Sequence, residues 1–152
     1  AAFGSVLAAL QLAALLYDPR AAVPTALDRA AGDALVARIR SVPGPVWTTH
    51  RGHLPALAGK RPRAHMMAVL DLMRSSADFQ GAKAQLGAEV REALSSRRFA
   101  LILMDNRDFW FLNELDRNYR RDERVWISDP GAMWPRAGAR IRPELGFVPR
   151  ER

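Results

Sequence analysis

The sequence contains no cysteine, which excludes disulfide bonds, thiolate-bound zinc and catalysis by a thiol. It also has little lysine, because only Lys60 and Lys83 accompany a large number of arginines. Histidine is limited to His50, His53 and His65, all within the segment THRGHLPALAGKRPRAH. Any imidazole chemistry in this protein therefore belongs to one short segment.

The charge balance is positive, with 23 Lys and Arg against 16 Asp and Glu and a formal net charge of +7. The basic residues are spread along the chain, mixed with acidic ones and not interleaved with aromatics, so no nucleic-acid partner is expected. A solvated basic surface is the leading interpretation, and attraction to anionic lipid headgroups is the next. The chain has 152 residues, 49% of them hydrophobic, which is enough for one domain with its own core.

The first sixteen residues, AAFGSVLAALQLAALL, carry no charge. A helix of that length spans about 24 Å, short of the roughly 30 Å hydrocarbon core of a bilayer. Neither an initiator Met nor a basic leader precedes the segment, so a secretory signal peptide is not indicated. We therefore expect residues 1–20 to be the end of a transmembrane helix whose first turns are missing, with Tyr17 as interfacial anchor, Pro19 as helix stop and Arg20 among the headgroups. The alternative is an apolar helix that packs on the protein's own core.

Residues 21–152 are predicted to form a single soluble α/β domain. TALD, with Thr25 as N-cap and Asp28 three residues on, is typical of a capping box at the start of a helix, and apolar residues at helical spacing continue to Val42. PVWTT (45–49) predicts a short strand rich in β-forming residues. A turn-rich loop, HLPALAGKRP, and a helix over AHMMAVLDLMRS should follow.

The second half predicts the strand around which the domain is built. A helix from about Lys83 to Ser96 leads into FALILMD (99–105), whose unbroken apolar character is typical of a parallel strand covered on both faces. DFWFLNELDRNY predicts another helix, ERVWIS (123–128) a third strand, and DPGAMWPRAGAR a loop. Pro143 should confine the extended C-terminal segment to a sheet edge or to a role outside the sheet. The predicted fold class is thus α/β: a small three-layer sandwich with a mainly parallel, minimal Rossmann-like sheet and an N-terminal apolar helix.

The histidine segment allows two interpretations. His50, His53 and His65 together with Asp71 would offer a metal ion three nitrogens and an oxygen, which would make the protein a self-contained metal-dependent enzyme. However, no HExxH motif is present, and residues three apart in a strand-to-loop segment need not point the same way. The other interpretation, which assigns no metal ligand, is a polar loop that caps helix ends and meets solvent.

Position in the sheet is more informative than residue type. In open α/β sheets, ligands bind beyond the carboxyl ends of the strands. Thr49 and His50 follow the first predicted strand, and Asp105 and Asn106 follow the second. If the two strands are neighbours, their tips would frame one polar cleft, with two further polar side chains near its rim: His65 and Asp71. The alternative for Asp105 is that it only caps the helix that comes next.

Several segments together resemble a known family. Together these segments cover nearly the whole chain. They are the apolar segment that exits through YDP, the VPT before a capped helix, the stretch PGPVWTTHRGHLPALAGKRPRAHMMAVLD, the buried FALILMD and the closing RPELGFVPR. They resemble the C-terminal soluble tail of bacterial polytopic glycosyltransferases of the GT-C kind, relatives of the dolichyl-phosphate-mannose–protein mannosyltransferases. The most telling part is an H-x-x-H/Y-L-x-x-x-A-G-K segment, here His50 to Lys60, followed by Asp71.

The resemblance implies a parent enzyme that transfers sugar from a polyprenyl-phosphate donor on the extracytoplasmic face, with its catalytic acid far upstream of this chain. The tail would be an accessory domain without catalytic residues or a cofactor, on the periplasmic side of the inner membrane. Its partners would be the membrane-embedded part of the parent protein, a polyprenyl-phosphate sugar or acceptor, and anionic lipid headgroups. Basic residues just after the apolar segment favour the cytoplasmic side instead, under a rule that weakens for long domains.

The residues predicted to contact substrate are polar side chains in or near the two strand tips: Thr49, His50, His53, Lys60, His65, Asp71, Asp105 and Asn106. No catalytic residue is assigned, because the chain has no Walker loop, dinucleotide fingerprint, GxSxG elbow or marked pair of carboxylates. Two rival functions stay open beside the accessory domain. One is the metal-dependent enzyme, and the other is a structural module that binds a membrane or a partner.

Overall fold

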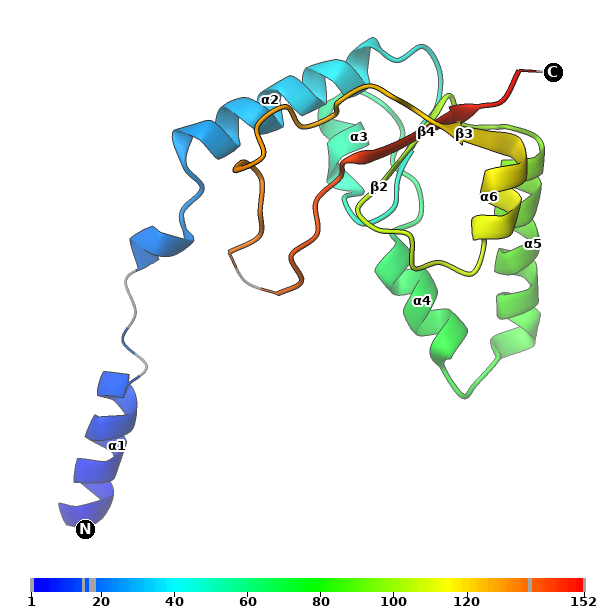
Figure 1. The fold of residues 1–152 in the computed structure, drawn as a ribbon. Coiled ribbons are helices and arrows are strands. Elements are labelled where there is room, and N and C mark those ends of the chain that lie inside the picture. The colour runs from blue at the N-terminus through cyan, green and yellow to red at the C-terminus, as the bar shows by residue number, and fades with distance from the viewer. Residues whose placement is uncertain (1, 15, 17–18, 137, 152) are drawn as a thin grey trace.

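The computed structural model describes residues 2–14, 16, 19–136 and 138–151 (Figure 1). The elements follow in chain order: α1 (Ala2–Ala14), the 3-10 turn η1 (Pro19–Ala22), α2 (Ala26–Ser41), β1 (Val46–Thr48), α3 (His53–Leu57), α4 (Met66–Arg74), the 3-10 turn η2 (Phe79–Gly81), α5 (Ala82–Ser95), β2 (Leu101–Met104), α6 (Leu112–Asn118), β3 (Tyr119–Arg121) and β4 (Leu145–Pro149).

The four strands form one mixed sheet in the order β1-β2-β4-β3. Within the described residues, β1 and β2 form the one parallel pair, with Val46 opposite Leu101, whereas β4 runs antiparallel to both β2 and β3. The predicted mainly parallel, Rossmann-like sheet is therefore wrong. The apolar run of β2 reports only that both faces of the strand are covered, which is equally true of a central strand with an antiparallel neighbour.

Helices and loops cover both faces of this sheet, because successive side chains of a strand point to opposite faces. In β2, Ile102 and Met104 join one buried cluster, while Leu101 and Leu103 join the other. The first cluster takes its remaining members mainly from β1, β4 and three helices: Trp47, Phe147, Met66 and Val69 of α4, Ala93 and Leu94 of α5, and Leu115 of α6. The second takes them mainly from β1, two other helices and a loop: Val46 of β1, Leu35 and Ile39 of α2, Leu54 of α3, and Trp126.

The capping box predicted for the first helix of the domain is confirmed at the start of α2. The Thr25 hydroxyl accepts a hydrogen bond from the Asp28 N–H at 3.1 Å, and the Asp28 carboxylate accepts one from the Thr25 N–H at 2.9 Å. Four residues apart on one face, Leu35 and Ile39 are fully buried against the sheet. Local sequence and packing thus agree on where this helix begins and which side faces inward.

Two strand predictions in the C-terminal third are wrong. ERVWIS (123–128) forms no strand, because the Arg38 guanidinium of α2 donates to the carbonyls of Val125 and Trp126 and so replaces a strand partner. Strand β3 lies earlier, at Tyr119–Arg121. Pro143 precedes β4 and so does not restrict it, which lets β4 occupy the inside of the sheet between β2 and β3. The predicted loop after β1 also contains a short helix, α3.

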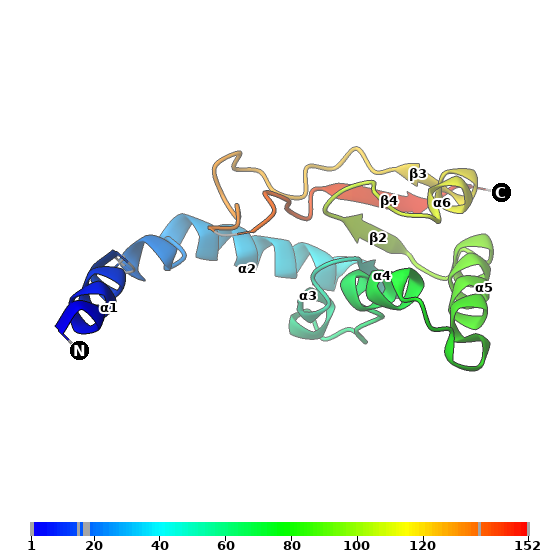
Figure 2. The ribbon, with the colours of Figure 1, turned by 90° about the horizontal axis from the view of Figure 1, so that it is seen from below.

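α1 lies apart from the sheet and its helices in both views (Figures 1 and 2). From Gly4 to Ala14 every residue of this 13-residue helix is exposed, so the alternative of a helix packed on the core is not what the structure contains. No helix in the described ranges combines the length and apolar character needed to cross a membrane, so the apolar membrane helix of the predicted fold has no counterpart there. Tyr17, the predicted interfacial anchor, lies outside the described residues.

Candidate functional site

The tips of β1 and β2 meet at one edge of the sheet, as their parallel pairing requires. Thr48 lies opposite Leu103, and the next residue along, Thr49, donates its N–H to the Leu103 carbonyl at 3.1 Å. The residues after β1 therefore emerge beside Asp105, the first residue after β2. We call Thr49, His50, Arg51 and Asp105 the strand-tip cluster.

Asp105 is the centre of this cluster. Its side chain is fully buried (0% exposed), and its Oδ2 atom accepts a hydrogen bond from Arg51 Nε at 3.0 Å. Within the described residues its other oxygen, Oδ1, has no hydrogen-bond partner, and His50 Nδ1 lies 3.9 Å from it. A buried carboxylate needs a counter-charge and hydrogen bonds. Arg51 supplies the charge and one bond, which leaves one acceptor position open.

His50 borders that open position. Its Nδ1 atom is 3.3 Å from the Thr49 hydroxyl, and its ring lies against Phe109, with 5.4 Å between centroids, and edge-on to His65 at 6.4 Å. Burial lowers the pKa of His50 below its ordinary value, the Asp105 carboxylate acts in the opposite direction, and His65 and Arg51 add to the lowering. The imidazole is therefore neutral at neutral pH, with one nitrogen that donates and one that accepts.

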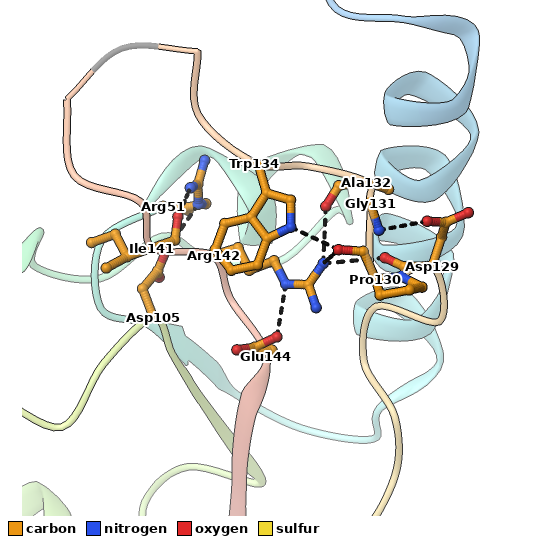
Figure 3. A network of polar contacts seen from close by, with 10 residues as sticks. All are labelled: Arg51, Asp105, Asp129, Pro130, Gly131, Ala132, Trp134, Ile141, Arg142 and Glu144. Atoms are coloured by element: carbon orange, nitrogen blue, oxygen red, sulfur yellow. Dashed lines mark hydrogen bonds and ion pairs between the residues drawn. The ribbon is translucent and has the colours of Figure 1, made fainter.

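Arg51 also fixes the cluster to the segment before β4. Its Nη2 donates to the Ile141 carbonyl at 3.0 Å, as Figure 3 shows. Beside it, Arg142 lies 4.4 Å from the centre of the Trp134 ring and bonds Glu144 Oε2 at 2.7 Å. The Nη1 atom of Arg142 holds the loop by three carbonyls, each at 3.1 Å: those of Asp129, Pro130 and Ala132. The irregular segment between β3 and β4 is thus held in place next to the strand tips.

Two other predicted site residues have structural roles. The Lys60 ammonium donates to the carbonyls of Val42 at 2.6 Å and Gly44 at 3.1 Å, just beyond the end of α2. His65 is the N-cap of α4, where its Nδ1 accepts a hydrogen bond from the Met67 N–H at 3.2 Å. Both residues therefore support helix ends, as the polar-loop interpretation expected.

The remaining predicted residues lie near or away from the cluster. Asn106 follows Asp105, and its side-chain oxygen accepts a hydrogen bond from the Asp108 N–H at 3.5 Å. His53 begins α3 and Asp71 lies on α4, both exposed. Across the residues that the structure places, no three His, Cys, Asp or Glu side chains gather as a metal ion would require. The metal-site alternative therefore gains no support from the geometry.

The structure thus brings together Thr49, His50 and Asp105 from the predicted set, and adds Arg51. Sequence reasoning passed over Arg51 because isolated arginines are common in this chain. One signal was available: an arginine directly after a histidine at the end of a strand, opposite a carboxylate that follows a fully apolar strand. A buried carboxylate at such a place needs a cation, and Arg51 is the cation in reach.

Comparisons of the chain with protein-family models, with curated proteins and with solved structures found no match. The resemblance to mannosyltransferase-related tails therefore depends on the segments quoted above.

Proposed function

We propose that this chain is an accessory, ligand-binding domain of an integral-membrane glycosyltransferase that uses a polyprenyl-phosphate-linked sugar donor. The strand-tip cluster would hold a hydroxyl-bearing part of the donor or acceptor. The observation that carries this proposal is the buried Asp105 carboxylate, whose Oδ1 atom lacks a hydrogen-bond partner within the described residues. A buried acceptor left unpaired is costly, and a sugar hydroxyl is a donor that would satisfy it.

The chemistry of the cluster suits binding better than bond cleavage. Arg51 already neutralises Asp105, and neutral His50 offers a donor or an acceptor beside the open carboxylate oxygen. Such a set of short, fixed polar groups fits neutral hydroxyls, which both donate and accept. No nucleophile with an adjacent base is needed for that role, in keeping with a catalytic acid that belongs to another part of the parent enzyme.

The exposed surface of α1 supports the membrane part of the proposal. Val6, Leu7, Leu10 and Leu12 are all exposed on this helix. A contiguous exposed apolar surface marks contact with another protein or with a membrane. We propose that this surface contacts the membrane-embedded part of the parent protein, on the extracytoplasmic side of the inner membrane as the resemblance implies. The coding region before Ala1 should then specify a series of hydrophobic segments, and a soluble domain there would contradict this assignment.

The binding test uses the sugar phosphate headgroup without its lipid. The full chain is titrated with mannose 1-phosphate and with glucose 1-phosphate while the His50 ring signals are followed by NMR. We expect saturable shifts at His50, and we expect Asp105→Asn to weaken binding by about tenfold or more, since a hydrogen bond to a charged group is lost. The exposed residue Asp108 gives the matched control, Asp108→Asn, which should bind the sugar phosphates as the unsubstituted chain does.

The pH dependence follows from the direction of the His50 shift. Protonated His50 would pair with Asp105 Oδ1 and occupy the open acceptor, so sugar binding should fall on acidification below the ordinary histidine pKa of 6.5. Because Asp105 raises the pKa of His50, Asp105→Asn should lower that pKa further. Absence of any sugar-dependent shift at His50, or equal effects of Asp105→Asn and Asp108→Asn, would remove the proposed binding role.

A further inference from the structure

A pocket opens on the sheet face that carries α4, α5 and α6, between α5 and the loop before α4. It is lined by the aromatic side chains of Trp47 and Phe99, by the aliphatic side chains of Leu86 and Val90, and by two arginines, Arg63 and Arg98. The volume is about 140 Å³. An apolar cavity of about 150 Å³ accepts one benzene molecule, so this pocket has room for a single ring.

The aromatic lining of the pocket is held in place. The rings of Trp47 and Phe99 are 5.3 Å apart between centroids and tilted by 33°. The Trp47 indole N–H donates to the Ala64 carbonyl at 3.1 Å, which fixes the loop that forms one side of the pocket. A flat apolar group would therefore meet a preformed surface, and little ordering would be needed on binding.

Arg63 gives the pocket its chemical preference. Its guanidinium carbon lies 5.9 Å from the centre of the Phe99 ring, and its Nε atom is buried without a hydrogen-bond partner among the described residues. A buried charged donor in that state costs stability until an acceptor reaches it. An anionic oxygen that reaches this atom from the pocket would be that acceptor, in a charge-assisted bond.

The other charged groups that line the pocket leave room for an anion. Arg98 pairs with Glu92 at 3.6 Å, but the two side chains are 45% and 72% exposed, so this ion pair is weak. Arg98 itself lines the pocket. Glu89, which also lines the pocket, accepts a hydrogen bond from Gln85 at 3.0 Å. The Glu89 carboxylate keeps its negative charge, but the two guanidinium groups of Arg63 and Arg98 outweigh it, and the Nε atom of Arg63 has no hydrogen-bond partner in the described part of the chain.

We propose that this pocket binds a small aromatic anion, with one ring over Trp47 and Phe99 and a phosphate or carboxylate held by Arg63 and Arg98. The site does not rest on the proposed function, because it lies at the start of β2, whereas the strand-tip cluster lies at its end. The shape of the pocket favours a ring, and the Arg63 Nε atom, which is unpaired among the described residues, favours an anion, so tight binding requires both parts of the ligand.

The test separates these two parts with three probes. The full chain is titrated with phenyl phosphate, with inorganic phosphate alone and with benzyl alcohol alone, and the Trp47 indole N–H signal is followed by NMR. We expect phenyl phosphate to bind most tightly and to shift the Trp47 signal. The sugar phosphate titration above is followed at His50 instead, so failure at one site is distinguishable from failure at the other.

A charge-removing variant with its matched control, and a variant that fills the pocket, test the assignment. Arg63→Gln should weaken phenyl phosphate binding by about tenfold or more, since it removes a charge-assisted hydrogen bond. Arg61→Gln changes the exposed arginine two residues away and should have no effect. Val90→Phe should fill the pocket and abolish binding, with Leu86→Phe as its substitute if the first variant fails to fold. Phenyl phosphate that binds no more tightly than inorganic phosphate, an unmoved Trp47 signal, or equal effects of Arg63→Gln and Arg61→Gln would overturn the proposal.

Discussion

α1 and α2 are both Ala- and Leu-rich helices, of 13 and 16 residues, yet only α2 belongs to the core. α2 buries Leu35 and Ile39 completely, whereas every residue of α1 from Gly4 onward is exposed. α2 also has Asp28 in its first turn and two arginines in its last, and α1 has no charged residue at either end. The more apolar helix is thus the one that packs on nothing in the described structure.

A high apolar content therefore does not by itself bring a helix into a water-soluble core. α2 has one apolar face and one charged face, so it fits between a sheet and solvent. α1 is apolar on all sides and would need an apolar environment all round it. The part of the domain that the structure describes does not supply one, since α1 is exposed from Gly4 to Ala14.

The largest expected effect comes from matched leucine truncations in the two helices. Leu35→Ala should lower the free energy of unfolding by about 2–5 kcal/mol, because it leaves a cavity against the sheet. Leu10→Ala in α1 should change it by less than about 0.5 kcal/mol, because an exposed side chain is removed. Denaturant unfolding followed by tryptophan fluorescence measures both. A Leu10→Ala variant as unstable as Leu35→Ala would mean that α1 packs on the domain after all.

A second pair of variants adds a methyl group to a glycine. In β4, a Cβ at Gly146 would lie 2.2 Å from Trp126 Nε1, in the same cluster as Leu35, so the indole would have to move. Gly146→Ala should therefore destabilise the domain by about 1–3 kcal/mol. Gly4→Ala in α1 meets nothing within 4 Å and should raise helix content without changing the unfolding midpoint. Thermal unfolding by circular dichroism compares the two, and a midpoint unmoved by Gly146→Ala would show that Trp126 packs differently.

Much of the fold could be predicted because local signals coincide with packing. The capping box at Thr25, the helical spacing of Leu35 and Ile39, and the apolar run of β2 each predict an element that the structure contains. Strand direction could not be predicted, since the run from Leu101 to Met104 would look the same beside a parallel or an antiparallel neighbour. The strand prediction for ERVWIS was wrong for a related reason, because Arg38, far away in the sequence, donates hydrogen bonds to the carbonyls of Val125 and Trp126.

The candidate site was predictable only where backbone topology decided it. Two adjacent parallel strands bring Thr49, His50 and Asp105 to one edge, whatever the side chains do. Lys60 and His65 are polar residues of the same loop, but their places depend on which helix end lies in reach, which spacing does not reveal. Arg51 was missed because its role arises from the burial of Asp105.

The smallest expected effect concerns pH and the cap of α2. Hydrogen bonds from Thr25 and from the Met133 N–H lower the pKa of Asp28 to about 2. A carboxyl whose pKa is lower in the folded state adds stability above its unfolded pKa, and this contribution is lost as the pH falls from about 4 to about 2. In that range the melting temperature of Asp28→Asn should fall less than that of the unsubstituted chain. Thr25→Ser keeps the hydroxyl, so its melting temperature should fall as that of the unsubstituted chain does. α1 contains no ionisable side chain, so the NMR signals of Leu10 should stay constant across the same range. If the melting temperature of Asp28→Asn depended on pH as that of the unsubstituted chain does, this cap would not distinguish the two helices.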